Sequence, residues 1–369
     1  MPPLARPVRV NGQLVGLFSF DIGSEIDLEK ARALTDRGER GEIERRRAAP
    51  ASLAYATPPL RVPLGTRPVQ VGETNVTADV SATIHDFGAV TIALWMPLAA
   101  DVSELPGLSA TLTNAGPLEG AARVIVEELY ARIEPAITRA GLNAFVEDYY
   151  VIHVASTDPP LTGPQLAAVA RGPLASALRC ESAPLSDAEI EDVFRTQLSY
   201  YPHDLVVTDW NVALVVDDEC TETVNILEYL NVQLVELRYY DALLDGRLAE
   251  TYSLLSARHR PLPLLYRPYR RAIEELNTMR LDVAALVERI HNALKLSGDL
   301  YLAKVYTRTA DRLSLHAWEE SVAGKLQVLQ SMFDVMVQRV TTTRAEALEL
   351  TVVFLILIEI VLFSVGSGH

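Results

Sequence analysis

An apolar run near the end of the chain constrains the fold more than any other segment. It reads "LELTVVFLILIEIVLFSV" over residues 348–365. The run is apolar all round and not along one stripe, which excludes a surface amphipathic helix. As a helix rising about 1.5 Å per residue it would measure about 27 Å, close to the hydrocarbon thickness of a bilayer, about 30 Å. We therefore predict a transmembrane helix over 346–365, inserted as a tail anchor. A buried C-terminal core helix is the alternative.

The charges that flank this run predict its orientation. Arg339 and Arg344 precede it, and no Lys or Arg follows it. The positive-inside bias then leaves the N-terminal region in the cytoplasm. The N-terminal "MPPLARPVRVNG" has no apolar segment of the kind that secretory signals carry. We expect a single-pass inner-membrane protein that contacts lipid through its C-terminal helix.

An acidic residue lies inside the apolar part of the run. Glu359 lies near its middle, where a carboxylate costs about 2.5–3.5 kcal/mol on insertion scales. A helix from another copy of the chain would supply a polar partner, so we expect a homo-oligomer. A glutamate that is protonated or reaches toward the headgroups is the alternative.

Composition excludes several classes of protein. The chain has 369 residues, 49% of them hydrophobic, so it is long enough for two cores. Its two cysteines lack CxxC spacing, which argues against a disulfide framework and a zinc site. A net charge of −15 disfavours DNA as a partner. Residues 258–344 nevertheless hold 14 Lys and Arg against 9 Asp and Glu. This basic segment fits anionic headgroups or a phosphate-bearing partner, or else forms a solvated helical face.

The hydrophobic pattern predicts an α+β fold followed by long helices. Residues 1–220 alternate strand and helix patterns, with a hairpin turn at Asp86-Phe87-Gly88 and a loop insertion over 36–57. Residues 221–345 show leucines on alternating three- and four-residue steps, which predicts a stalk of long antiparallel, coiled-coil-like helices. Asp241 interrupts this apolar seam. The expected order is thus a mixed or antiparallel sheet with helices over 1–220, the stalk over 221–345 and the anchor over 346–365.

Four stretches resemble a known family: "HDFGAVTIALWMPL", "ILEYLNVQLVELRYYDALLD", "DLYLAKVYTRTADRLSLHAWEESVAGKL" and "RAEALELTVVFLILIEIVL". They resemble the "required for meiotic nuclear division" family, a domain of unknown function, in the same order along residues 14–365. The resemblance implies a membrane-associated protein with a helical C-terminal region, here a bacterial member. Mitochondrial members are linked to organelle translation, and the resemblance carries no catalytic residues.

No motif in the sequence predicts an enzyme. Phosphate loops, dinucleotide fingerprints, nucleophile elbows and HExxH are all missing, so we predict no catalytic residue, cofactor or metal. The alternative is a hydrolase or nucleotide-binding site that brings together Glu147, His153, His203 and Asp209. The acidic stretch "DDECTE", residues 217–222, either binds a divalent cation or lies at a helix start, where carboxylates meet the positive end of the dipole.

A basic helical face is the predicted contact surface. Lys304, Arg308 and Arg312 recur every four residues, and Arg267, Arg270 and Arg271 form a second basic group. They suit the phosphates of lipid or ribosomal RNA, or else form intramolecular ion pairs. Together these features predict a non-enzymatic scaffold that holds a protein or ribosomal partner at the membrane.

Overall fold

The computed structural model describes residues 7–35, 39–40, 58–112, 116–256, 278–281, 283–284, 288 and 300–366. Within these ranges, the side chains of 39–40, 254–256, 336–337, 339–348 and 361–366 lie outside the description. The chain forms two compact units, unit 1 (Met1–Tyr239 and Leu286–Trp318) and unit 2 (Tyr240–Ala285 and Glu319–His369). The predicted loop insertion over 36–57 lies almost wholly outside the described residues.

Unit 1 is built on one mixed sheet, which confirms the predicted α+β class. Eight strands lie in the order β3-β4-β5-β6-β1-β8-β10-β9, and only β8 and β10 pair in parallel. Their bounds are β1 (Arg9–Asp21), β3 (Glu39–Arg40), β4 (Leu60–Val71), β5 (Thr74–Ile84), β6 (Ala89–Asp101), β8 (Val146–Asp158), β9 (Leu205–Thr208) and β10 (Val212–Val216). A separate small pair joins β2 (Glu25–Ile26) to β7 (Ile137–Thr138).

The turn between β5 and β6 is the predicted one. Gly88 has a φ of +101°, a region that side chains with a Cβ rarely adopt. A Cβ at this position would also lie 1.9 Å from the carbonyl oxygen of Gly23. Glycine is therefore required both by the backbone angle and by the close approach of the neighbouring chain.

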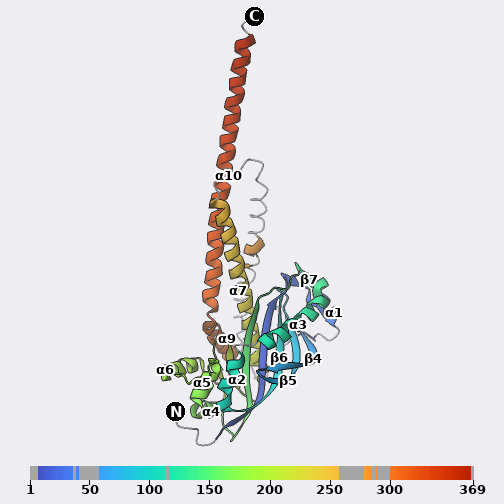
Figure 1. Ribbon diagram of the computed structural model, residues 1–369, viewed down its shortest axis with the longest axis vertical. Helices are drawn as coiled ribbons and strands as arrows, with labels where there is room; N and C mark the ends of the chain where they lie inside the picture. The colour runs from blue at the N-terminus through green and yellow to red at the C-terminus, as the bar shows by residue number, and fades with distance from the viewer. Residues whose placement is uncertain are drawn as a thin grey trace. The chain divides into compact units, whose positions relative to one another are not determined.

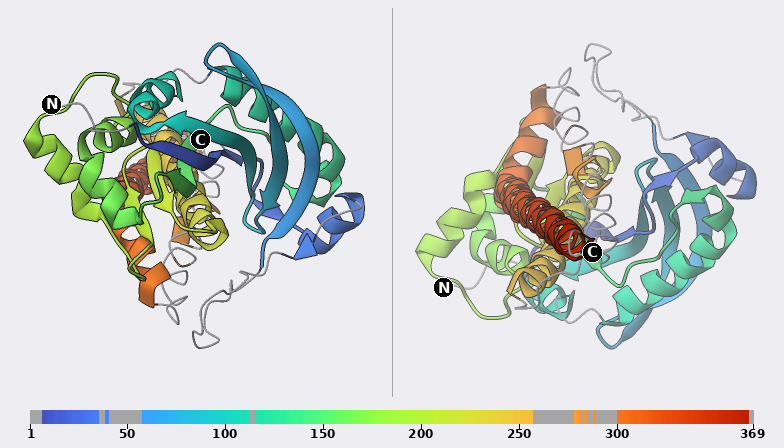
Figure 2. Two further views of the ribbon diagram at one scale, coloured as in Figure 1. Left: turned by 90° about the horizontal axis from the view of Figure 1, so that it is seen from below. Right: turned by 90° about the horizontal axis from the view of Figure 1, so that it is seen from above.

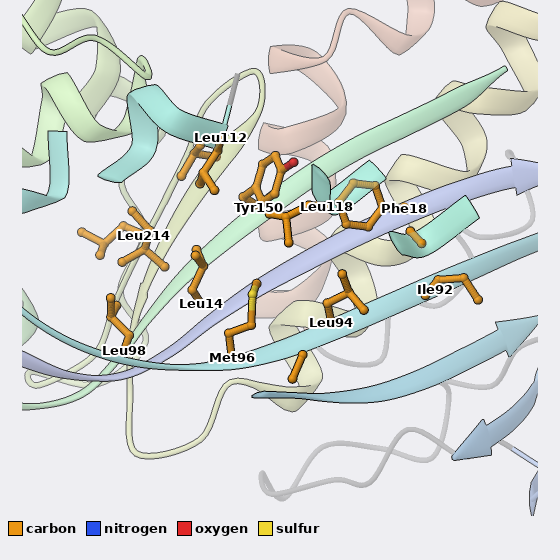
Figure 3. Close-up of a cluster of buried hydrophobic side chains, with 14 of the residues drawn as sticks. Leu14, Phe18, Ile92, Leu94, Met96, Leu98, Leu112, Leu118, Tyr150 and Leu214 are labelled. Atoms are coloured by element: carbon orange, nitrogen blue, oxygen red, sulfur yellow. The ribbon is translucent and has the colours of Figure 1, made fainter. Parts of the chain in front are cut away.

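Helices cover one face of the sheet and enclose the main hydrophobic core (Figures 1 and 2). This face carries the even-numbered residues of β1, β6 and β8, for example Phe18, Ile92 and Tyr150 (Figure 3). The covering elements are α1 (Leu28–Thr35), α2 (Leu105–Leu112), α3 (Gly116–Ile133), α4 (Gly163–Val169), α5 (Arg171–Leu178) and α6 (Asp187–Val193), with short 3-10 turns η1 (Val102–Glu104), η2 (Glu134–Ala136) and η3 (Phe194–Thr196).

The first half of α7 (Thr221–Ser256) and α9 (Leu300–Arg312) lie on the other face of the sheet. Every residue of α7 from 223 to 233 is buried. The leucine spacing indicated only one apolar side of this helix, and the stalk was predicted to begin at residue 221. The opposite side of α7 is buried too, because its polar residues meet polar residues of the sheet, as described below.

In unit 2 the second half of α7 packs beside α10 (Leu315–Gly366). The Asp241 carboxylate accepts from Ser321 Oγ at 2.7 Å and pairs with Lys325 Nζ at 2.8 Å, and Asp245 pairs with Lys325 at 2.7 Å. The contacts advance in the same direction along both helices, so α7 and α10 are parallel, which is also the direction that the first and third helices of the predicted antiparallel hairpins would have. The interruption of the leucine seam at Asp241 is thus an ion pair between helices. The predicted return helix over 273–294 lies mostly outside the described residues.

Compactness divides the chain differently from the predicted parts 1–220, 221–345 and 346–365. Both unit boundaries fall inside long helices, at residue 239 in α7 and residue 318 in α10. The predicted division into an α+β part, a stalk and an anchor assigns a role to each segment, and it stays a prediction.

Candidate functional site

A row of polar side chains crosses the sheet beneath α7. Arg61, Thr83, Thr91, Ser19 and Glu147 are direct cross-strand partners on five adjacent strands, β4-β5-β6-β1-β8. Partners in register on antiparallel strands point to the same face. The hydroxyls of Ser19 and Thr91 bond at 2.9 Å, and both residues are fully buried. We call these five residues the polar row.

Three buried residues of α7 contact this row. Arg61 donates to Asn225 Oδ1 at 2.6 Å, and Glu228 is hydrogen-bonded to Thr83. Asn231 Nδ2 donates to Ser19 Oγ at 3.0 Å and to the Glu147 carbonyl at 2.9 Å. Because buried polar groups are costly when they lose their partners, the row fixes the rotation and register of α7 on the sheet.

The carboxyl groups of this interface resist ionisation. Burial raises the pKa of Glu228, although Arg61 and Thr83 act in the opposite direction. Burial raises the pKa of Glu147 to about 7, against the attraction of Arg238 on α7, its ion-pair partner. Burial also lowers the pKa of the nearby His85 to about 3, so that its ring is neutral. Glu147 is therefore the group of this interface whose pKa lies near neutral pH, so it can exchange a proton there within the fold.

Glu147 makes the stability of unit 1 depend on pH. Its pKa in the fold lies above its ordinary value of 4.5, so the group favours folding below that value and loses this contribution as pH rises through about 7. Glu147→Gln is expected to be about 1–3 kcal/mol more stable, relative to wild type, at pH 8 than at pH 5. Urea unfolding followed by tryptophan fluorescence at both pH values measures this difference. An equal difference in unfolding free energy between variant and wild type at the two pH values would contradict this prediction. Burial also raises the pKa of Asp21 to about 6, but Asp21 is present in both proteins, so its contribution cancels in the comparison.

The four residues of the predicted catalytic alternative do not converge. Glu147 and His153 are six residues apart on β8, about 20 Å at the rise of a strand. His153 Nε2 lies 2.9 Å from the carbonyl oxygen of Asp217, and the exposed His203 ring stacks on Tyr201 with centroids 5.5 Å apart. Asp209 belongs to an ion-pair network described next. The site that was predicted from these residues is therefore not assembled.

Asp209 anchors α9 to the sheet. It follows β9 and is completely buried. Its carboxylate accepts from Arg312 Nε at 2.9 Å and from Arg179 at 3.2 Å, and both arginines also bind Asp192 of α6, at 2.9 and 2.7 Å. Hydrogen bonding and attraction from Arg312 lower the pKa of Asp192. Arg312, which was predicted to contact a partner, is thus engaged within the chain.

The other predicted cations divide into two groups. Lys304 and Arg308 are exposed on α9, and the Arg308 guanidinium donates to the Arg195 carbonyl at 2.8 Å. Arg267, Arg270 and Arg271 lie outside the described residues. Only the first group has a described surface around it.

Exposed aromatic residues, which were not among the predicted contact residues, border this cationic stripe. Tyr200, Tyr201 and Trp210 are 54%, 44% and 52% exposed. The Tyr200 ring packs edge-on against Tyr301 of α9, with centroids 5.5 Å apart. The motif "SYYPH" at 199–203 was the available signal, since two tyrosines before a proline form a loop with large side chains. We call Arg195, Tyr200, Tyr201, Trp210, Lys304 and Arg308 the α9 surface.

A metal site is not found in the described part of the chain. No group of three or more His, Cys, Asp or Glu side chains there could hold a metal ion. In the "DDECTE" stretch, Asp217 accepts from the backbone N–H of Asp218 at 2.8 Å just before α7 begins at Thr221. The acidic residues therefore lie at a helix start, as one of the two interpretations held.

The far part of α10 exposes its apolar side chains. All residues from 349 to 360 are exposed, including Phe354 at 65% and Leu350 at 70%. Within the described residues we find no helix with the length and apolar character needed to cross a membrane. The predicted span over 346–365 is described only in part, because the side chains of 346–348 and 361–365 lie outside the description.

Comparison with known proteins finds a family of unknown function. The family model described as "Uncharacterized protein MJ0711, N-terminal domain" matches residues 11–222, which include most of the sheet and end where α7 begins. The uncharacterized protein MJ0711 of Methanocaldococcus jannaschii is 25% identical over 191 residues, 51% of this chain and 58% of that protein. The chain thus covers little more than half of the relative's length. No solved structure matches the chain.

Proposed function

We propose a tethering function for this chain, which belongs to the family described as uncharacterized protein MJ0711, N-terminal domain. In this proposal it is a single-pass, non-enzymatic adaptor. The apolar end of α10 enters a membrane, and unit 1 holds a partner on the cytoplasmic side. A kinship with the "required for meiotic nuclear division" family, and with it a translation-related partner at the inner membrane, forms the more specific part of the proposal.

The exposed apolar stretch of α10 is the observation that carries this proposal. Between 349 and 360, nine large hydrophobic side chains face solvent, and each would gain about 1.5–3 kcal/mol on complete burial. They lie all round the helix, whereas a partner helix would cover one stripe. The sequence stays apolar as far as Val365. Lipid covers such a cylinder on every side, which favours a bilayer over a protein groove.

Charges around the stretch support an orientation. Arg339 and Arg344 precede it in the sequence, so unit 1 would remain on the cytoplasmic side. Glu359, which is exposed, would find a polar partner in the span of a second copy. Homo-oligomerisation in the membrane is therefore part of the proposal.

Charged substitutions in the apolar stretch test the proposal. Val353→Lys/Leu357→Lys places two lysines four residues apart on exposed apolar positions. Each costs about 2.5–3.5 kcal/mol near the centre of a span, so the membrane-bound fraction is expected to fall more than a hundredfold. Co-flotation of the full-length protein with phosphatidylcholine–phosphatidylglycerol vesicles measures this fraction.

Gln327→Lys/Ser331→Lys is the matched control. It adds the same charges with the same spacing to exposed positions earlier in α10, and it should float like wild type. Wild-type protein that stays at the bottom of the gradient would overturn the tethering function. If the wild-type protein stayed at the bottom as an oligomer, and Val353→Lys/Leu357→Lys made it monomeric, then other copies of the chain and not lipid would cover the apolar stretch.

A further inference from the structure

The α9 surface is continuous along the whole length of α9. Tyr301, Lys304, Arg308 and Arg312 recur every three or four residues, so they lie on one stripe of the helix. The segment 195–210 runs beside this stripe and contacts it at the start, in the middle and at the end, through Tyr200, the Arg195 carbonyl and Asp209 respectively. From residue 301 to residue 312 the stripe measures about 16 Å.

A buried carboxylate holds the aromatic end of this surface in place. Asp204, only 2% exposed, accepts from the backbone N–H groups of Tyr200 at 2.7 Å and Tyr201 at 3.1 Å. The two tyrosine rings pack edge to face with centroids 4.7 Å apart, and the His203 ring stacks on Tyr201. Two large exposed rings are therefore oriented by a buried carboxylate, so a partner that binds them has less conformational entropy to remove.

The other end carries Trp210. Its backbone N–H donates to Asp209 Oδ1 at 2.8 Å, so the ion-pair network that anchors α9 also fixes the base of this side chain. Exposed aromatic rings thus lie at both ends, and Lys304 and Arg308 lie between them. Tyr, Trp and Arg are the residues enriched among binding hot spots of protein interfaces.

The charges around the surface discriminate between polyanions and peptides. The neighbouring α6 carries Asp187, Glu189, Glu191 and Asp192, and Asp192 also pairs with Arg195 at 3.3 Å. A nucleic acid strand, with a phosphate on every nucleotide, would meet these carboxylates as well as the cations. A peptide can place its few carboxylates only where the cations are.

The spacing of the two cations fits an extended chain. Side chains four residues apart on a helix have Cβ atoms about 6 Å apart, close to the roughly 6.6 Å between alternate residues of a strand. About five extended residues span the 16 Å of the stripe on α9. Carboxylates at alternate positions of such a segment would reach Lys304 and Arg308, with apolar or aromatic side chains before and after them.

We propose that the α9 surface binds an extended acidic segment of a partner protein, with two carboxylates on Lys304 and Arg308 and flanking apolar side chains against Tyr200, Tyr201 and Trp210. This inference names the chemistry of the partner in the proposed function and rests on it. Binding at the surface does not require lipid, however, so its test is separate from the flotation test.

Selection from a random library of displayed twelve-residue peptides tests the inference. The target is the full-length protein in mild detergent. Enriched peptides are expected to be acidic, with carboxylates at alternate positions next to an aromatic residue or proline. Synthesised with a fluorescent label, they should bind Lys304→Glu/Arg308→Glu at least tenfold more weakly than wild type in anisotropy titrations. The same peptides with lysine in place of the acidic residues should bind this variant and not wild type.

Two further variants distinguish the contribution of this surface to binding from general effects of charge and mutation. Tyr200→Ala/Tyr201→Ala should also weaken binding about tenfold, because the aromatic contacts are lost. Arg67→Glu/Arg132→Glu makes the same charge change at exposed positions, in β4 and in α3 on the opposite face of the sheet, and should leave affinity unchanged.

Three results would overturn the proposal. In the first, the selection yields no acidic consensus. In the second, Lys304→Glu/Arg308→Glu binds the selected peptides as tightly as wild type. In the third, labelled oligouridine binds the surface more tightly than the selected peptides. Peptide binding without flotation would retain this surface and reject the tether, whereas flotation without peptide binding would do the reverse.

Discussion

Asp209→Ala is expected to destabilise unit 1 by about 3–5 kcal/mol. The buried carboxylate accepts from two arginines of different elements, Arg179 of the chain after α5 and Arg312 of α9. Its removal leaves both guanidinium groups with one acceptor fewer in a partly buried place, and loss of one member of such a pair costs more than the pair contributes. The midpoint of urea unfolding measures the effect. All three tryptophans, Trp95, Trp210 and Trp318, lie in unit 1 and report its unfolding.

Two controls sharpen this measurement. Asp209→Asn keeps the shape and accepts one hydrogen bond, so it should cost less than alanine. Glu189→Ala removes an exposed partner of Arg179 and should change stability by less than about 1 kcal/mol. A wild-type midpoint for Asp209→Ala would show that α9 is held on the sheet without this network.

Phe18→Ala is expected to cost about 3–5 kcal/mol through a cavity in the main core. Phe18 lies in the centre of β1, is fully buried and meets Tyr150 of β8 edge-on, with ring centroids 5.9 Å apart (Figure 3). Alanine would remove the ring from a layer that strands and helices enclose on both sides. Urea unfolding by tryptophan fluorescence again provides the measurement.

The matched control for Phe18 is an exposed apolar residue of the same unit. Val124 on α3 is 54% exposed, so Val124→Ala should change stability by less than about 0.5 kcal/mol. Phe18→Leu, which refills most of the volume, should fall between the two. A cost for Phe18→Ala no larger than that for Val124→Ala would contradict the described core.

The sequence predicted those parts of the fold that depend on residues close together along the chain. The β5–β6 turn followed from Gly88, because only glycine suits its backbone angle and its contact with Gly23. The mixed α+β class followed from the order of strand and helix patterns over residues 1–220. Such features need no knowledge of which distant segments meet.

The polar row and the parallel pairing of α7 with α10 depend on distant segments, so the sequence did not reveal them. Ser19, Thr83 and Thr91 are ordinary strand residues until register places them side by side. Asn231 lies within a leucine pattern that had been interpreted as a stalk, so its contact with the sheet was not predicted. Asp241 was noted as an interruption, but its partner Lys325 lies 84 residues further along the chain. Long-range pairing of this kind has no local pattern.

The candidate surface was half predicted. Lys304 and Arg308 were named from their spacing on one helical face, and both are exposed. Arg312 shares that spacing but pairs with Asp209, because a buried acceptor at the end of β9 lies within its reach. The tyrosines beside them come from a loop more than 90 residues earlier, and nothing near α9 in the sequence indicates them.

Alkaline carbonate extraction of membranes from cells that express the full-length chain tests the tether most directly. Carbonate strips proteins held by charge or by other proteins and leaves those whose apolar segments lie in lipid. We expect the wild-type protein to stay in the membrane pellet and Val353→Lys/Leu357→Lys to move it to the supernatant. Wild-type protein released into the supernatant by carbonate would contradict it.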